Sequence, residues 1–395
     1  MQIVKFKYAK YVLAVLIILL VKIFYAVHAG AVIDRINTSY IYFGNPSSYF
    51  TAVSSAQDSL DIVYPSYFDL SSGGNLKLTS AVSRGFVDEM HRKGIKVAPF
   101  LSNHWDRTAG RAALANRAAL ASQIAEAVKK YDLDGVNIDL ENLTPDDRAN
   151  YVDFVRLLRL ALPDGKEISV AVAANPYGTS KGWQGSYDYA GLARYSDYLV
   201  IMAYDESYET GPAGPVASIP FVEKSLKYAV KNVSPDKIVL ALPFYGRMWR
   251  DGGGYPNGYG VGNRTIDSLI SEYKGKRYYD SASQTSYARI TIGPGDRKPV
   301  IGGKALTAGT YTIWYSDEAT LKRSLALVDK YDIMGASSWS LGQESANTWS
   351  YFTLWLAGCY FVDIQYHWAR DSIFSAYANG WVKGVSSASF APRMH

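Results

Sequence analysis

Cysteine is almost absent from this chain of 395 residues: Cys359 is the only one, so no intrachain disulfide can form. A fold without such cross-links depends on a large apolar core, and a hydrophobic content of 48% can supply one. Histidine is also scarce, with five in the chain, and no cluster of His and Cys has the spacing of a metal site. We therefore expect neither a metal ion nor another cofactor.

Acidic residues are missing from the first 29 positions, which carry Lys5, Lys7, Lys10 and Lys22. The formal net charge of +5 comes mainly from this segment, because the rest of the chain has 37 basic and 36 acidic residues. A nearly neutral protein lacks the basic surface that attracts a phosphate backbone. We therefore expect no nucleic-acid partner.

The same segment has the pattern of a secretory leader. Its lysines precede an apolar run from Tyr11 to Val21, and small residues follow at Val27-His28-Ala29. Lys22 interrupts the apolar run, which is short for a membrane span, although residues 23–27 would lengthen it in an uncleaved anchor. We predict a signal peptide at residues 1–29 and a secreted protein, membrane-anchored if the leader is retained.

Short β-branched runs alternate with helical stretches through most of the chain, for example the Ala-rich stretch 112–130 and the stretch 145–161, where Thr144 is a plausible N-cap. This alternation predicts a (β/α)8 barrel over residues 30–357. A doubly wound open sheet is the alternative, but no Gly-x-Gly-x-x-Gly turn follows the first strands. The eight expected strands are residues 39–43, 60–64, 95–101, 135–140, 168–173, 198–203, 238–243 and 333–339.

One connection breaks this rhythm, because more than seventy residues separate Pro243 from Asp317. The segment is rich in Gly, Tyr and Thr and contains strand-like pieces at 287–292 and 310–314. We predict a small β-rich (α+β) insertion at about 247–316, after the seventh strand. Barrel active sites lie at the carboxyl ends of the strands, so the insertion would wall a substrate cleft, unless it is only a decorative loop.

Residues 134–141, Asp-Gly-Val-Asn-Ile-Asp-Leu-Glu, place unusual polarity on the fourth strand. Side chains alternate along a strand, so Asn137, Asp139 and Glu141 share one face. Two carboxylates this close cannot flank a glycosidic bond from opposite sides as a separate acid and nucleophile. They also do not both ionise comfortably, so one is expected to hold a proton. Glu141, the outer one, is the predicted general acid.

Polar and aromatic residues gather at the expected carboxyl ends of the other strands. Because these ends meet at one face of a barrel, their side chains are candidates for a single site. His104 belongs to this group but is expected to be a structural hydrogen-bonding residue, and Asn175-Pro176 alone would indicate only a turn. The group consists of Tyr67, Asn103, His104, Asn175, Tyr204, Asp205, Tyr245 and Trp339.

Three of these segments carry a family resemblance. Residues 134–141, Met202-Ala203-Tyr204-Asp205 and Trp339-Ser340-Leu341-Gly342 resemble motifs of the family 18 glycoside hydrolases, the chitinase superfamily, over about residues 36–356. Typical chitinases have Asp where this chain has Asn137. With Asn at position 137 and its sequence at 142–148, the chain resembles the bacterial branch of the family that contains spore-cortex and cell-wall N-acetylglucosaminidases.

The resemblance implies substrate-assisted retaining catalysis, in which the 2-acetamido oxygen of the substrate is the nucleophile. Glu141 would be the acid and base, Asp139 would orient the acetamido N–H, and Tyr204 would bind its carbonyl. The supporting residues would be Asn137, Asp205 and Met202, and the substrate-binding residues would be Trp339, Tyr67, Asn103, Asn175 and Tyr245. A lectin of the same fold is the alternative to an enzyme.

The expected partner is a polysaccharide, either peptidoglycan or chitin. Both contain the β-1,4-linked N-acetylglucosamine that this mechanism needs. Peptidoglycan is favoured over chitin by the bacterial branch, and the protein would be a monomer, secreted or associated with the cell wall of a bacterium. Residues 358–395 resemble part of an S-layer homology repeat, with Phe361-Val362-Asp363-Ile364 and His367-Trp368-Ala369. One partial repeat predicts at most weak contact with wall polymer.

Overall fold

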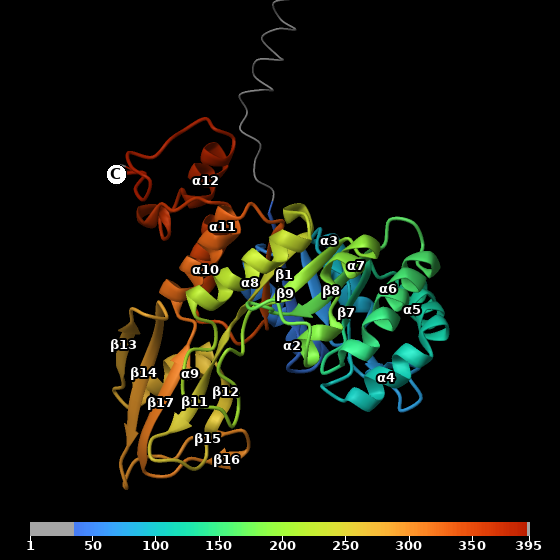
Figure 1. The fold of residues 1–395 in the computed structure, drawn as a ribbon. Coiled ribbons are helices and arrows are strands. Elements are labelled where there is room, and N and C mark those ends of the chain that lie inside the picture. Colours follow the sequence, from blue (N-terminus) through green and yellow to red (C-terminus); the bar gives the residue numbers. More distant parts are fainter. Residues whose placement is uncertain (1–34, 393–395) are drawn as a thin grey trace, which may run out of the picture. The chain divides into compact units, whose positions relative to one another are not determined.

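The computed structural model describes residues 35–392 (Figure 1). The leader predicted at residues 1–29 lies outside the described residues. Contacts between residues divide the chain after Asp34 and after Leu356, so residues 35–356 form one compact unit. The second division lies one residue from the predicted boundary at 357. Among the described residues, no helix has the length and apolar character needed to cross a membrane.

Residues 35–356 contain a (β/α)8 barrel, as predicted (Figure 1). Neighbouring staves pair in parallel, and the eighth stave pairs with the first, so the ring closes there. The staves are β1 (Ile36–Ile41), β2 (Ile62–Pro65), β5 with β6 (Lys96–Val97 and Phe100–Ser102), β7 (Gly135–Asp139), β8 (Glu167–Ala173), β9 (Tyr198–Met202), β10 (Ile238–Pro243) and β18 (Gly335–Trp339).

The third stave is split because Pro99 has no backbone N–H to give to a ladder. Its first part, β5, pairs with β2, and its second part, β6, pairs with β7. The Pro99 carbonyl still accepts a hydrogen bond from the N–H of Asn137, and the Ala98 N–H donates to the carbonyl of Val63. The short strand β3 (Phe68–Leu70), which follows β2 in the chain, pairs with β6 and with β4 (Leu76–Leu78).

Helices cover the outside of the barrel. The stretch 112–130, expected as one helix, is broken at Asn116, whose side-chain amide donates to Gly74 and Asn75. Thr144 caps the next segment as predicted, in a capping box with Asp147. The helices are α2 (Pro46–Ser55), α3 (Arg84–Arg92), α4 (Arg107–Ala115), α5 (Arg117–Tyr131), α6 (Arg148–Ala161), α7 (Tyr189–Tyr195), α8 (Ile219–Asn232), α10 (Glu318–Lys330) and α11 (Thr348–Leu356), with single 3-10 turns at 145–147, 183–186 and 235–237.

The predicted insertion contains a five-stranded antiparallel sheet, a two-stranded sheet of β15 and β16, and one helix, and it begins at Tyr245, two residues earlier than expected. The strand order of the larger sheet is β12-β11-β17-β14-β13, and the expected strands at 287–292 and 310–314 are present as β14 and β17. The bounds are β11 (Tyr245–Arg250), β12 (Asn257–Gly262), α9 (Asn263–Glu272), β13 (Lys276–Asp280), β14 (Thr285–Ile292), β15 (Val300–Ile301), β16 (Lys304–Ala305) and β17 (Gly309–Tyr315).

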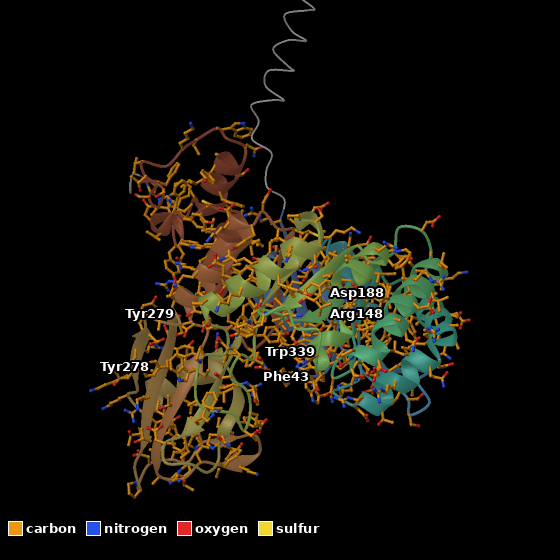
Figure 2. All side chains as sticks on the ribbon, in the orientation of Figure 1. Phe43, Arg148, Asp188, Tyr278, Tyr279 and Trp339 are labelled. Atoms are coloured by element: carbon orange, nitrogen blue, oxygen red, sulfur yellow. The ribbon has the colours of Figure 1, made fainter. Side chains whose placement is uncertain are left out.

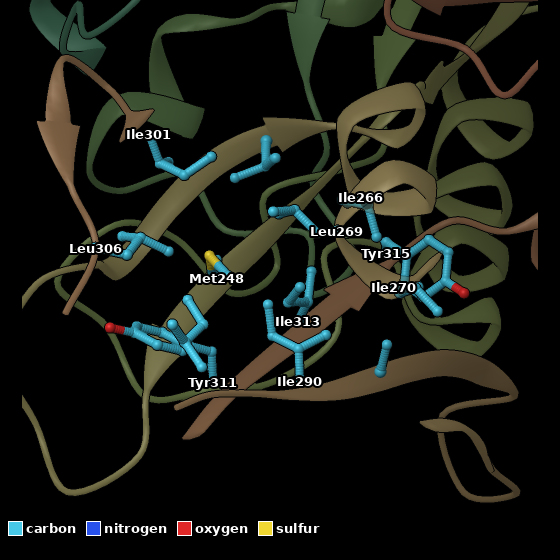
Figure 3. Packing of buried hydrophobic residues seen from close by; sticks show 13 residues of the cluster. Met248, Ile266, Leu269, Ile270, Ile290, Ile301, Leu306, Tyr311, Ile313 and Tyr315 are labelled. Atoms are coloured by element: carbon cyan, nitrogen blue, oxygen red, sulfur yellow. The ribbon is translucent and has the colours of Figure 1, made fainter. Parts of the chain in front are cut away.

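The insertion has its own hydrophobic core, separate from that of the barrel. Met248, Ile290 and Ile313 point from the sheet toward Ile266 and Leu269 of α9, and all five are buried (Figure 3). Burying one such side chain contributes about 1.5–3 kcal/mol, so this cluster can hold the sheet rigid. A rigid insertion can fix the side chains that it presents to the barrel.

The described part of the second unit contains a 3-10 turn (Val362–Ile364) and helix α12 (Arg370–Ala378). The Asp363 carboxylate accepts hydrogen bonds from Ser389, Phe390 and Ala391, and the Phe361 ring packs on that of Tyr377. These contacts fold residues 361–391 back on themselves.

Candidate active site

Strand β7 directs its polar row into the barrel. Asn137 is fully buried; it accepts a hydrogen bond from the Tyr40 hydroxyl at 3.0 Å and donates to the Ser169 hydroxyl at 2.8 Å. Gly135 begins the strand because a Cβ there would lie 2.2 Å from the backbone oxygen of Glu167. Asn137 is therefore held by the hydroxyls of Tyr40 and Ser169, and its uncharged amide is fixed two residues before Asp139 on the same face of β7.

Asp139 is the last residue of β7, and only 4% of it is exposed. Its Oδ1 atom has no hydrogen-bond partner among the described residues. Burial raises the pKa of this carboxyl to about 7, because the charged form loses its hydration. A buried carboxyl without a partner is costly, and it offers an acceptor or a proton to a ligand.

Glu141 lies two residues beyond Asp139 and lines the cleft, where the residue is partly exposed. Its pKa is raised well above the ordinary value by burial first, and then by the negative charges of Asp139 and Asp205. Glu141 therefore holds its proton more firmly than an exposed glutamate does. A raised pKa suits a general acid that protonates a leaving group near neutral pH.

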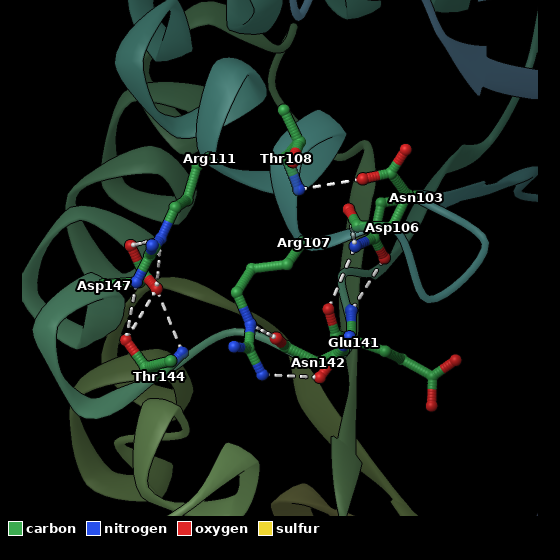
Figure 4. Close-up of polar contacts among 9 residues, drawn as sticks. All are labelled: Asn103, Asp106, Arg107, Thr108, Arg111, Glu141, Asn142, Thr144 and Asp147. Atoms are coloured by element: carbon green, nitrogen blue, oxygen red, sulfur yellow. Dashed lines mark hydrogen bonds and ion pairs between the residues drawn. The ribbon is translucent and has the colours of Figure 1, made fainter.

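The backbone of Glu141 is fixed by side chains that come from the end of β6 and the start of α4 (Figure 4). Asn103 accepts from the Glu141 N–H at 2.8 Å and donates to its carbonyl oxygen at 2.9 Å. The next residue, Asn142, has a φ of +56°, and Arg107 donates to both its carbonyl and its side-chain oxygen. These contacts hold the turn that aims the acid.

The wall opposite this turn comes from β9 and the insertion. The backbone of Asp205 has a φ of +58°. Its carboxylate accepts two hydrogen bonds from Arg247, at 2.9 and 2.7 Å, and one from the Tyr245 hydroxyl, at 2.6 Å. Tyr204 packs edge-on against Tyr245, with ring centroids 6.1 Å apart, and it remains partly exposed in the cleft. The insertion thus fixes Asp205 and, through Tyr245, the Tyr204 ring.

The cleft itself has a volume of about 770 Å³, a size that suits a small ligand or a few sugar rings. Glu141, Met202, Tyr204 and Asp205 line it together with Arg247. Aromatic rings from the loops after β6 and β8 line its outer part, namely Trp105, Tyr177 and Trp183, with the two indoles 4.9 Å apart. Exposed aromatic faces and few polar groups are typical of a carbohydrate cleft.

Trp339 ends β18 and remains partly exposed over the buried aromatic cluster of the barrel interior. Its ring lies 5.2 Å from that of Tyr40 and 5.3 Å from that of Tyr42. Because Tyr40 also binds Asn137, the indole is adjacent to the β7 row and can form an apolar floor beside Asp139.

Four residues predicted to bind substrate have other contacts in this structure. Tyr67 is fully buried near Phe86, and its ring does not line the cleft. Asn103 and Asn175 are each 2% exposed. The side-chain amide of Asn103 is hydrogen-bonded to the backbone of Glu141, and that of Asn175 to the backbone of Thr179. Tyr245 is buried and donates to Asp205. These contacts show how Asn103, Asn175 and Tyr245 are held, while the Tyr67 hydroxyl has no partner among the described residues. A role in substrate binding stays a prediction for all four.

The remaining predicted residues lie near the barrel mouth. His104 approaches the Asp69 carboxylate, with its Nε2 3.3 Å from Oδ1, so its contact is with protein, as expected for a structural role. No group of three His, Cys, Asp or Glu residues in the described part of the chain has the arrangement of a metal site.

This geometry agrees with a family assignment. Residues 39–344 match the model of the glycosyl hydrolases family 18. The chain belongs to this family. Among relatives, it is 29% identical to an uncharacterized glycosylase, YvbX, of Bacillus subtilis over 65% of this chain and 74% of the relative. It is 27% identical to the cortical fragment-lytic enzyme of the same organism over 58% of this chain and 51% of that enzyme, so it spans about half the length of this relative.

Solved structures show the same fold. A chitinase from Chromobacterium violaceum superposes with a TM-score of 0.72 at 22% identity, covering 82% of this chain and 99% of that chain. The spore cortex-lytic enzyme SleL of Bacillus cereus superposes with a TM-score of 0.69 at 20% identity, covering 82% and 74%. The chain is therefore a family 18 glycoside hydrolase with the barrel and insertion of that fold.

Several residues of this family 18 site were not predicted from the sequence. Arg247 was detectable, since alternation on β11 places it on the same face as Tyr245. Asn142 follows the acid, and Asn is one of the few residues that adopt positive φ readily, so a turn there was also detectable. Trp105 and Trp183 lie on loops far apart in the chain, and only the fold shows that they meet.

Proposed function

We propose that this family 18 hydrolase cleaves β-1,4 bonds next to N-acetylglucosamine in peptidoglycan by substrate-assisted retaining catalysis. Glu141 protonates the leaving oxygen and later activates water. Asp139 orients the 2-acetamido N–H, and Tyr204 binds the acetamido carbonyl, so the acetamido oxygen is held for attack on its own anomeric carbon. Asn137, Asp205 and Met202 support this pocket, and Trp339 is its floor.

The observation that carries this proposal is the state of Asp139. Its Oδ1 is buried without a partner among the described residues, its pKa is raised to about 7, and Glu141, whose pKa is also raised, lies two residues further along the chain. Such a carboxyl is prepared to accept a hydrogen bond from an amide N–H, which the acetamido group of the substrate supplies. Asp205, another cleft carboxylate, raises the pKa of Glu141 by its charge, and it is engaged by Arg247 and Tyr245, so it is poorly placed to act as a nucleophile.

Peptidoglycan is preferred as substrate because two similar proteins are a cortical fragment-lytic enzyme and a spore cortex-lytic enzyme. Chitin is the second candidate, supported by the exposed indoles of the cleft and by the chitinase that shares the fold. Both substrates supply the acetamido group.

The test uses the Glu141→Gln variant and purified peptidoglycan or chitin oligomers, with the products identified by mass. We expect muropeptides that end in reducing N-acetylglucosamine, and a loss of about 10²–10⁴-fold in rate for the variant, because a general acid is removed. Glu272→Gln, on the outer helix of the insertion and paired with Arg297, is the matched control and should keep wild-type activity. Products of chitin alone would overturn the substrate assignment. Equal inertness of wild type and Glu141→Gln, with both still binding glycan, would identify a lectin.

We also propose that the protein acts outside the cytoplasm of a bacterium, secreted or held at the wall, since its leader has the pattern of a signal peptide. The segment 358–395 would add weak contact with wall polymer, on its resemblance to part of an S-layer homology repeat. Retention of the intact protein on purified wall, compared with a variant ending at residue 357, tests the second statement.

A further inference from the structure

A second pocket lies beside the cleft, at the ends of β1 and β18, with a volume of about 470 Å³. Phe43 and Gly44 form its edge after β1, Gln343 comes from the loop after β18, and Arg264 and Thr265 come from the start of α9 in the insertion. We call it the Arg264 pocket. It shares no lining residue with the cleft that contains Glu141, so it is a separate feature of the barrel mouth.

Aromatic rings lead from Trp339 to the edge of the Arg264 pocket. The Trp339 ring lies 5.3 Å from that of Tyr42, which in turn lies 4.9 Å from that of Phe43 at the edge of the Arg264 pocket (Figure 2). Tyr42 and Phe43 are 37% and 52% exposed, unusual values for neighbouring large apolar rings. A glycan whose N-acetylglucosamine ring rests on Trp339 would therefore place its next sugar over Tyr42 and Phe43, within reach of the pocket.

The polar groups of the pocket suit an acyl or carboxylate substituent. The Arg264 side chain is 56% exposed, and among the described residues its polar contacts are long and are made with Glu344. Its Nε lies 3.5 Å from the Glu344 carbonyl oxygen, and its Nη2 lies 3.7 Å from the Glu344 Oε1. Most of its donors are therefore available in a geometry that matches a carboxylate or carbonyl.

The chemistry of the two candidate polymers differs at this position. In peptidoglycan, N-acetylglucosamine alternates with N-acetylmuramic acid, so both neighbours of the ring on Trp339 are muramic acids, whichever way the strand runs. Each carries a lactyl group on its 3-oxygen, where chitin has only a hydroxyl. We propose that the Arg264 pocket binds this lactyl group through its carboxyl or acyl oxygen, and thereby favours peptidoglycan over chitin. This inference rests on the proposed function.

The test compares two soluble substrates of equal length, an alternating tetrasaccharide freed of peptide and a chitin tetramer. We expect Arg264→Gln to lower the ratio of the two kcat/KM values, alternating over chitin, by about tenfold, and Arg264→Lys to recover part of this loss because it restores the charge. Arg148→Gln is the matched control: Arg148 is also partly exposed and paired with one carboxylate, that of Asp188, but lies on the outer barrel (Figure 2). It should leave the ratio unchanged.

The failures are distinguishable. If wild type cleaves the alternating substrate and Arg264→Gln keeps the wild-type ratio, the pocket does not read the lactyl group and the proposed function stands. An equal loss on both substrates would show that Arg264 has only a structural role, and it would also overturn the inference. If wild type cleaves chitin and not the alternating substrate, the proposed function fails, and the inference fails with it.

Discussion

Two carboxyls in the same barrel, the buried Asp139 and the partly buried Glu167, have almost the same acidity and very different surroundings. Burial raises the pKa of each to about 7. Asp139 ends β7 at the mouth of the barrel, and its Oδ1 has no partner among the described residues. Glu167 begins β8 at the other end, where it accepts a hydrogen bond from the Tyr198 hydroxyl at 2.5 Å and lies 3.9 Å from the Lys96 Nζ.

The difference shows that a raised pKa alone does not mark a catalytic group. The Tyr198 hydroxyl also contacts that of Tyr64 at 2.6 Å, so Glu167 belongs to a hydrogen-bonded group that the protein satisfies internally. Asp139 is left without such a partner among the described residues, at the end of its strand and two residues before Glu141, which lines the cleft. We infer that the missing partner, more than the acidity, distinguishes the functional carboxyl.

The largest expected effect comes from Asp139→Asn. The variant cannot accept the acetamido N–H with a charge or stabilise a positive intermediate, so we expect kcat to fall about 10²–10³-fold. The same substitution should increase the free energy of unfolding at high pH. Because the folded-state pKa of Asp139 is raised, wild type loses stability as the pH rises from about 4 to about 7, and the variant does not. At pH 8 the variant should therefore be the more stable, by on the order of 2–4 kcal/mol at most.

Urea unfolding at pH 4.5 and pH 8, together with release of reducing ends, checks this prediction. A variant that is active at the wild-type rate would remove Asp139 from the mechanism. A variant with the same stability difference at both pH values would show that Asp139 is ionised without penalty.

Much of this comparison was accessible from the sequence. Alternation along residues 134–141 placed Asn137 and Asp139 on one inward face, and the strand and helix rhythm gave the barrel that makes this face an interior one. The broken helix at Asn116 was missed because its cause, contacts with Gly74 and Asn75, comes from a segment more than forty residues away. Local pattern cannot show such a contact.

The site was predicted less completely than the fold. Residues at strand ends were correctly placed near the barrel mouth, yet position in the chain does not show what a polar side chain binds. Asn103 and Asn175 follow their strands as expected but bond to backbone, and Tyr245 bonds to Asp205. Arg264, by contrast, lies in the insertion, and only the fold brings it to Phe43.

A smaller effect is expected from Glu167→Gln, which removes the satisfied carboxyl. Its pKa is also raised, so it costs wild type stability as the pH rises from about 4.5 to about 7. The variant should lose this slope, which amounts to at most about 3 kcal/mol, while the amide oxygen still accepts from Tyr198. Activity should stay at the wild-type level because Glu167 lies at the amino-terminal end of the barrel. A loss of activity comparable to that of Asp139→Asn would contradict the distinction between the two carboxyls.

The smallest effect is expected from Tyr198→Phe, which makes Glu167 resemble Asp139 by removing its donor. The hydrogen bond from Tyr198 lowers the pKa of Glu167 against the effect of burial, so its loss should raise that pKa further. It also leaves the Tyr64 hydroxyl without this neighbour, and we expect a loss of about 1–2 kcal/mol in the free energy of unfolding. The loss should be larger at pH 8, where the carboxylate is charged, than at pH 4.5, and urea unfolding at the two pH values measures it. Activity at the mouth should change little, since an unpartnered carboxyl has functional value only where substrate can supply the partner; an altered pH profile of kcat would show instead that the two ends of the barrel are coupled.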